Sequence, residues 1–274
     1  MKTPTPATPT TIHPESQEFY PELLRTLDAA HVPYLVGGGY AMAHYTGIPR
    51  QTKDLDIYVH PQDSQHTLDV LSAAGYRTEY FYPFWIAKAL PPAPGPDGGD
   101  DVFMDILYNS GNGVCHVDEQ WFTRSVPAEA HGHPVRLVAV EETLWCKAFV
   151  QDRDRFDGAD VAHLILCHGR KIDWDHLISR FAGGHEGVLL AHLVLFRYIY
   201  PTERACVPDA VFDRLLEATR TEPRPRTKLC RGTNLANRSF GMDIERWGYT
   251  DARLKPHGSL TPDEIAQMPP PERR

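Results

Sequence analysis

Three aspartates lie within two apolar runs of the sequence, and together they could bind a divalent cation. Asp54 and Asp56 alternate with apolar residues over positions 54–59. Because side chains along a strand alternate between its two faces, these two carboxylates would share one face. Neighbouring carboxylates repel each other, and a divalent cation, which prefers hard oxygen ligands, would remove that repulsion.

Asp105 stands inside a second apolar run, positions 102–107, and alternates with its neighbours in the same way. If its strand pairs beside the first, all three carboxylates meet on one face of a sheet. Three carboxylates can hold two Mg²⁺ ions, an arrangement suited to in-line displacement at phosphorus. The sequence therefore predicts Asp54, Asp56 and Asp105 as metal ligands and as catalytic residues.

A run of glycines precedes the first two aspartates and could bind phosphate. Positions 32–36 are expected to form a short strand, the glycines at 37–39 a turn, and positions 40–45 the start of a helix. Backbone N–H groups at such a junction can approach a triphosphate. The spacing fits neither GxGxxG nor GxxxxGK followed by Ser or Thr, which excludes the dinucleotide-binding and P-loop motifs.

Each of these features also has a purely structural explanation. An isolated Asp-x-Asp at a strand end, a glycine turn and a single aspartate on an edge strand are all common without chemistry. Their combination in this order favours a metal and nucleotide site, because all of them must fall at strand edges.

In this combination the sequence resembles the nucleotidyltransferase superfamily that includes DNA polymerase beta. More narrowly, it is similar to the small bacterial branch of antibiotic nucleotidyltransferases and AbiEii-like toxins. The family motif is Gly-Gly or Gly-Ser, a gap, Asp-x-Asp, and a third Asp on a later strand. The matching positions are Gly38, Gly39, Asp54, Asp56 and Asp105, with Ala41, Gly47, Arg50, Thr52 and Ile57 matching the narrower branch.

The resemblance implies a metal-dependent enzyme with a nucleoside triphosphate as substrate and two Mg²⁺ ions as cofactors. It places nucleotide-binding groups at Gly38, Gly39 and Thr52. A later helix of the family carries a lysine that is thought to reach the nucleotide phosphates, followed by an acidic residue. Lys147 matches that lysine. Asp157 is taken as the acid, with Asp160 and Asp154 as competing matches, and a charge-rich segment of this kind also forms ordinary solvated helix faces.

The composition agrees with a cytoplasmic enzyme that has no contact with a membrane. The chain has 274 residues, 42% of them hydrophobic, and a net charge of −8. No apolar run is long enough to span a membrane, and the N-terminus lacks the apolar core of a signal peptide. Five scattered cysteines without a CxxC pair indicate reduced thiols rather than a disulfide framework or a zinc site.

The pattern of apolar residues predicts an α/β fold: a small mixed sheet flanked by helices, followed by a helical C-terminal subdomain. Further helices are expected at 16–30, 62–74, 159–166, 174–181, 187–200 and 211–218, and further strands at 78–85 and 135–138. The expected organisation is a disordered N-terminus (1–14), a nucleotidyltransferase domain (15–157), a helical subdomain (158–221) and an irregular tail (222–274).

The acceptor of the transferred group is expected to be a hydroxyl of a small molecule or of RNA, with tRNA as one candidate and an antitoxin as a candidate protein partner. The negative net charge argues against a general nucleic-acid binder. One local stretch is basic, and it either binds a polyanion or forms a tail without contacts. Its six basic residues, with Glu222 as the single acid, are Arg220, Arg224, Arg226, Lys228, Arg231 and Arg238.

Two other functions compete with nucleotidyl transfer. A glycosyltransferase also binds a metal–nucleotide through Asp-x-Asp, but it needs neither the upstream glycine turn nor Asp105. A catalytically inactive module of the same fold, which binds a nucleotide or a protein, is the other alternative. The complete set of three aspartates argues against such a degenerate module.

Overall fold

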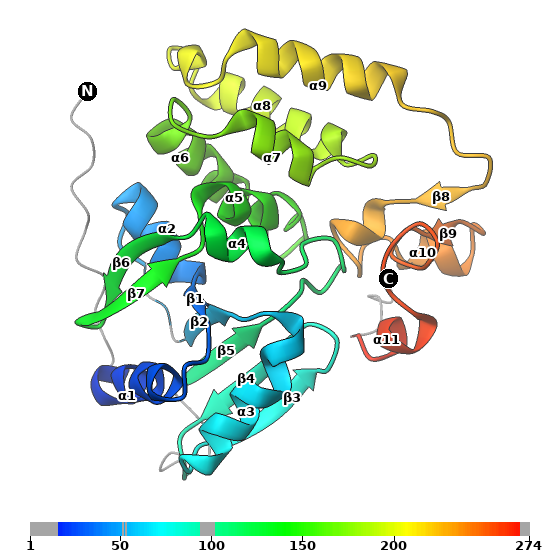
Figure 1. Ribbon diagram of the computed structural model, residues 1–274. Helices are drawn as coiled ribbons and strands as arrows, with labels where there is room; N and C mark the ends of the chain where they lie inside the picture. Colours follow the sequence, from blue (N-terminus) through cyan, green and yellow to red (C-terminus); the bar gives the residue numbers. More distant parts are fainter. Residues whose placement is uncertain (1–15, 51, 53, 94–101, 269–274) are drawn as a thin grey trace. The chain divides into compact units, whose positions relative to one another are not determined.

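The computed structural model describes residues 16–50, 52, 54–93 and 102–268 (Figure 1). The chain divides into two compact units. The first lies within Met1–Gly111 and His116–Ala139, and the second within Asn112–Cys115 and Val140–Arg274. The N-terminal segment predicted to be disordered, residues 1–14, lies outside the described residues.

A seven-stranded mixed sheet forms the centre of the first unit, with the strand order β3-β4-β5-β2-β1-β7-β6. Its strands are β1 (Leu35–Val36), β2 (Asp54–Tyr58), β3 (Arg77–Tyr82), β4 (Ile86–Leu90), β5 (Phe103–Leu107), β6 (Val126–Ala130) and β7 (His133–Leu137). The β2–β5 and β1–β7 pairs are parallel, and the other neighbours are antiparallel.

Helices pack against this sheet. Those of the first unit are α1 (Ser16–Ala29), α2 (Gly38–Thr46), α3 (Ser64–Ala73), with the 3₁₀ turn Pro61–Asp63 before it, and α4 (Glu119–Thr123). α3 lies against β3, β4 and α1, while α2 lies against β2 (Figure 1). The predicted fold class of a mixed sheet flanked by helices is therefore confirmed.

The alternation of residues along β2 and β5 separates a core face from a polar face. Leu55 and Ile57 of β2 and Met104 and Ile106 of β5 are fully buried. They join one cluster with leucines of α1 and α3. Burying each such side chain is worth about 1.5–3 kcal/mol. The aspartates between them face the other side of the sheet and are only half-buried.

Two strands of the seven-stranded sheet, β4 and β6, are not predicted by the sequence. β4 has the sequence Ile-Ala-Lys-Ala-Leu, and alanine and lysine are poor strand formers. β6 contains Pro127, which suits its place at the edge of the sheet, because proline cannot donate a ladder hydrogen bond. In both cases the tertiary pairing outweighs the local preference.

The second unit is mainly helical, as predicted for the C-terminal part of the chain. Its helices are α5 (Val140–Ala148), α6 (Gly158–His168), α7 (Trp174–Arg180), α8 (Glu186–Ile199), α9 (Asp209–Thr221), α10 (Gly241–Glu245) and α11 (Pro262–Ala266), with 3₁₀ turns at Arg204–Cys206 and Gly232–Asn234. Among the described residues no helix is both long enough and apolar enough to cross a membrane.

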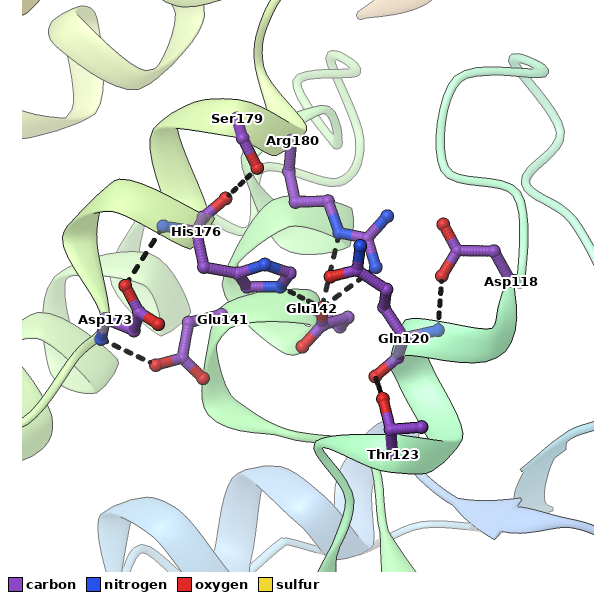
Figure 2. A network of polar contacts seen from close by, with 9 residues as sticks. All are labelled: Asp118, Gln120, Thr123, Glu141, Glu142, Asp173, His176, Ser179 and Arg180. Atoms are coloured by element: carbon purple, nitrogen blue, oxygen red, sulfur yellow. Dashed lines mark hydrogen bonds and ion pairs between the residues drawn. The ribbon is translucent and has the colours of Figure 1, made fainter.

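The division between the units differs from the domain boundary expected after residue 157. The main part of the second unit begins at Val140, because α5 packs against α6 and α7. A buried carboxylate holds part of this packing together (Figure 2). Glu142 of α5 has a fully buried side chain, 2.6 Å from His176 Nε2 and 3.2 Å from Arg180 Nη2 on α7. Such polar contacts cannot be read from hydrophobic periodicity.

The segment 222–274, expected to be an irregular tail, contains several short elements. They include α10, α11 and a two-stranded parallel pair of β8 (Leu229–Cys230) and β9 (Thr250–Asp251). A buried ion pair fixes this region, since Arg253 Nε lies 3.0 Å from Asp251 Oδ1. Thr233 donates to the same oxygen at 2.8 Å. Buried polar contacts, rather than an apolar repeat, thus hold this region in place.

His131, in the turn between β6 and β7, should make stability depend on pH. Its ring Nε2 pairs with the hydroxyl of Tyr40, and burial lowers the pKa of His131 from 6.5 to about 4. The folded state therefore disfavours the imidazolium form. The contribution of the neutral His131 ring to the free energy of unfolding is therefore fully present above pH 6.5, and it is lost as the pH falls toward 4.

His131→Asn removes this titration and tolerates the positive φ of 51° at this position. Between pH 6.5 and pH 4 the wild-type protein should lose on the order of 2 kcal/mol more than the variant, allowing for the partial exposure of the ring. Urea unfolding at a series of pH values measures this difference. The exposed His66→Asn is the control, and equal pH profiles for His131→Asn and wild type would contradict the prediction.

Candidate functional site

The register of β2 against β5 brings the three predicted aspartates together. Asp56 lies directly opposite Asp105 in the parallel pair. Asp54, one alternation earlier on β2, shares their face. One carboxylate oxygen of each of the three residues lies within 4.8 Å of the other two. The three carboxylates are therefore close enough together to be a candidate metal site.

The surroundings of the aspartates suit a hard divalent cation. All three side chains are half-buried, so their charges are only partly screened by water. Burial raises the pKa of Asp105, the Lys88 ammonium opposes that change, and the neighbouring charge of Asp54 adds to it. A cation bound among the three carboxylates would favour their ionised forms, and the donor set consists of the oxygens that Mg²⁺ and Mn²⁺ prefer.

Thr52 orients the first aspartate. Its hydroxyl contacts the backbone oxygen of Asp54 at 2.8 Å and the Oδ1 of the same residue at 2.5 Å. The side chain of Asp54 is therefore fixed by the residue two positions before it. A contact between Thr52 and a nucleotide stays a prediction.

The glycine turn packs directly against the second aspartate. Gly37 N donates to the backbone oxygen of Asp56 at 3.0 Å, and α2 begins at the next residue. Gly38 has a φ of +53°, and a Cβ atom built on it would lie 1.6 Å from Asp56 Oδ2. Only glycine fits this position, for reasons of both backbone conformation and space.

Gly39 is also tightly enclosed, because a Cβ atom there would lie 3.3 Å from Thr52 Cβ. Gly38 and Gly39 thus form the first turn of α2, beside Asp56 and Thr52. The N–H groups of a first helical turn have no partners within the helix, and they carry partial positive charge. This end of α2 can attract an anionic group next to the carboxylates.

A lysine that the sequence did not indicate completes the cluster. Lys88 of β4 lies opposite Asp105, and its Nζ is 3.0 Å from Asp105 Oδ1. It is the one charged residue of an otherwise buried strand, since Ile86, Ala87, Ala89 and Leu90 are all buried. The sequence signal that could have indicated Lys88 is a single lysine within an apolar run, but the strand β4 itself was not predicted.

Lys147 and Asp157 lie in the second unit and pair with each other. Lys147, in the last turn of α5, places its Nζ 2.7 Å from Asp157 Oδ2 and 3.0 Å from Asp160 Oδ2. All three side chains are largely buried. The lysine therefore joins the end of α5 to the start of α6, and a contact with phosphate stays a prediction.

Three residues of the basic stretch 220–238 make local contacts. Arg220 pairs with Glu217 at 2.7 Å, and Lys228 donates to the backbone oxygen of Trp247 at 3.3 Å. Arg231 donates to the backbone oxygen of Gly184 at 3.0 Å. These contacts account for half of the positive charges that could have formed an RNA-binding strip.

Comparison with known families gives one match within the chain. Residues 21–87 match the model of the aminoglycoside-2''-adenylyltransferase family. The matched segment includes the glycine turn, Thr52 and the aspartates of β2, and it ends before Asp105. No curated protein sequence matches the chain.

Several solved structures resemble the chain at low identity. A nucleotidyltransferase-like antigenic protein from Paracoccidioides brasiliensis is 18% identical, with 72% of this chain and 96% of that chain covered and a TM-score of 0.43. The antibiotic-resistance factor ANT(2'')-Ia is also 18% identical, over 71% of this chain and 97% of that chain, with a TM-score of 0.39.

The lincosamide antibiotic adenylyltransferase LnuA, in its lincomycin-bound form, is 17% identical, over 58% of this chain and 99% of that chain, with a TM-score of 0.38. Because all three TM-scores lie below 0.5, we base no conclusion on these structures. The family match is independent of them and falls on the segment that carries the glycine turn and the first two aspartates. It confirms, for residues 21–87, the predicted resemblance to the nucleotidyltransferase superfamily.

Proposed function

We propose that the chain is a metal-dependent nucleotidyltransferase, which moves a nucleoside monophosphate from a nucleoside triphosphate to a hydroxyl group of an acceptor. The observation that carries the proposal is the juxtaposition of Asp56 with both Asp105 and the first turn of α2. A carboxylate cluster and a helix N-terminus that touch each other can bind a metal ion and a phosphate side by side. If the aspartates were only a surface acidic cluster and the glycines only a turn, the two would have no reason to touch each other.

Each of the candidate site residues in the first unit then has a role in the proposed reaction. Asp54, oriented by Thr52, and Asp56 would hold Mg²⁺, and the ion would supply positive charge that neutralises the phosphates. Gly38 and Gly39 present backbone N–H groups to the phosphates. Asp105 would accept the proton of the acceptor hydroxyl, or would hold a second ion that lowers the pKa of that hydroxyl.

The bonds exchanged follow from this arrangement. The acceptor oxygen forms a bond to the α-phosphorus as the bond from that phosphorus to the bridging oxygen breaks. The electron pair of the broken bond leaves with pyrophosphate, and the hydroxyl proton passes to Asp105 or to solvent. We also propose that Lys147 and Asp157 contact the nucleotide, and this assignment rests on the resemblance to the family motif alone.

The acceptor that we propose is a small molecule with a free hydroxyl. The matched family model is named for transfer to an aminoglycoside, a small molecule of this kind. Transfer to tRNA is the competing outcome, and label transfer from radioactive ATP to hydroxylated small molecules or to total tRNA separates the two. An inactive nucleotide-binding module, or one that binds a protein such as an antitoxin, would bind ATP or its partner but transfer no label.

Asp54→Asn tests the metal-dependent nucleotide site. The amide keeps the size of the side chain but removes one anionic ligand, so ATP should lose its Mg²⁺-dependent binding and transfer should fall by about 100-fold or more. Titration calorimetry with ATP, with Mg²⁺ or with EDTA, measures the binding. Asp69→Asn, on the exposed side of α3, is the matched control. Unchanged transfer by Asp54→Asn would falsify the assignment.

Gly38→Ala tests the contact between the glycine turn and Asp56. The added methyl group collides with Asp56 Oδ2, so metal-dependent ATP binding should weaken by at least about ten-fold, and stability should fall by about 1–3 kcal/mol. Gly75→Ala is the control, because Gly75 has a φ of +94° and nothing within 4 Å of its built Cβ. It should lower stability alone. Equal effects of the two variants on ATP affinity would contradict the proposed site.

Lys147→Ala tests whether the second unit contributes to nucleotide binding. A charged phosphate contact is worth about 1.5–3 kcal/mol, so ATP affinity should fall by about ten-fold or more. The unfolding midpoint should also fall, because Asp157 and Asp160 lose a shared partner. Asp160→Asn, which keeps Lys147, should change stability without changing affinity. If Lys147→Ala binds ATP as wild type does, the lysine only joins α5 to α6.

A further inference from the structure

Lys88 belongs to the same row of side chains as the aspartates. Along this row, Lys88 of β4 lies opposite Asp105 of β5, which lies opposite Asp56 of β2. Residues that are directly opposite in neighbouring strands project from the same face of the sheet. The ammonium group is therefore part of the proposed site, and it approaches the cluster from the side of Asp105.

The position of the ammonium group is fixed by its surroundings. Its Nζ lies 3.0 Å from Asp105 Oδ1, and the two side chains are only 17% and 13% exposed. The ring centroid of Phe103 is 3.7 Å from the same Nζ, and that of Phe81 is 5.2 Å away. A largely buried ammonium is costly unless it is paired, and here a carboxylate and two aromatic rings offset that cost.

The charges in the cluster limit how many divalent ions it can take. The Lys88 ammonium, 3.0 Å from Asp105 Oδ1, already occupies a side of that carboxylate where a second ion would bind. A second ion beside Asp105 would have to displace Lys88 or share its carboxylate at short range, where like charges repel strongly because the groups are partly buried.

We propose that Lys88 takes the place of a second metal ion. In the free protein the cluster binds one divalent cation, held by Asp54 and Asp56, while Asp105 stays paired with Lys88. Lys88 is then a positioning residue that holds Asp105 toward the acceptor, and Asp105 serves as the proton acceptor rather than as a metal ligand. This inference rests on the proposed function, because it assumes that Asp54 and Asp56 bind a metal.

The alternative is that the Lys88–Asp105 pair only strengthens the contact between β4 and β5. Those strands are already joined by backbone hydrogen bonds over four residue pairs. The two explanations differ in what happens to metal binding when the ammonium group is removed. A purely structural lysine would affect stability and leave the number of bound ions unchanged.

Counting Mn²⁺ ions on the full chain without nucleotide tests the proposal. Electron paramagnetic resonance of free Mn²⁺ gives the number bound per chain and the affinity of each site. Wild type should bind one ion. Lys88→Met, which replaces the ammonium with an apolar side chain of similar length, should bind two, or bind the first at least about ten-fold more tightly. Lys88→Arg keeps the charge and should bind one.

Two further variants locate the second ion. Asp105→Asn should still bind one ion, because Asp54 and Asp56 remain. The double variant Lys88→Met with Asp105→Asn should return from two ions to one. If Lys88→Met does not fold, Asp105→Asn decides alone: retention of one ion supports the proposal, and loss of Mn²⁺ binding overturns it.

The possible failures are distinct from one another. Two ions on wild type, or one ion of unchanged affinity on folded Lys88→Met, overturns the role of Lys88 and leaves the proposed function in place. No Mn²⁺ on any variant overturns the metal site itself, and with it both proposals. Thermal unfolding with and without Mn²⁺ provides the check on folding, and Lys88→Met should gain more from the ion than wild type does.

Discussion

The parallel register between β2 and β5 is the constraint on which the candidate site depends. It places Asp56 opposite Asp105, and a slip by one residue would turn Asp105 toward the apolar face. The same slip would expose Met104 and Ile106, which are fully buried. The core therefore selects the register, and the register assembles the carboxylates, even though their mutual repulsion acts against it.

The fold tolerates this repulsion because one face of the strands is apolar and buried in the core, while the other face carries the charged side chains. Leu55 and Ile57 pack with leucines of α1 and α3, and each buried side chain is worth about 1.5–3 kcal/mol. On the opposite face, Lys88 and the first turn of α2 bring positive charge to the carboxylates. Stability thus comes from one face of the sheet, and the other face is free to hold charges that folding alone would not favour.

Most of the first unit could be predicted from the sequence, because alternation along β2 and β5 and the helical spacing of leucines are local patterns. What could not be predicted depends on partners distant in sequence. The contact between Lys88 and Asp105 exists only because β4 pairs with β5. This pairing could not be predicted, because β4 has weak strand propensity. The C-terminal segment likewise depends on a buried contact between distant residues, the hydrogen bond from Thr233 to Asp251. Periodicity reports which face a residue occupies, but not which strand lies beside it.

The site also implies that metal and nucleotide bind together. A triphosphate is strongly anionic, and three carboxylates beside the first turn of α2 would repel it if no cation were present. The partial charge of a helix N-terminus is worth at most about 2 kcal/mol, which is too little to offset that repulsion. Lys88 is paired with Asp105 and reduces the repulsion on that side of the cluster. In the proposed function, a cation bound to the cluster would therefore determine whether the phosphates can approach, and the glycine turn would contact them only once that charge had been balanced.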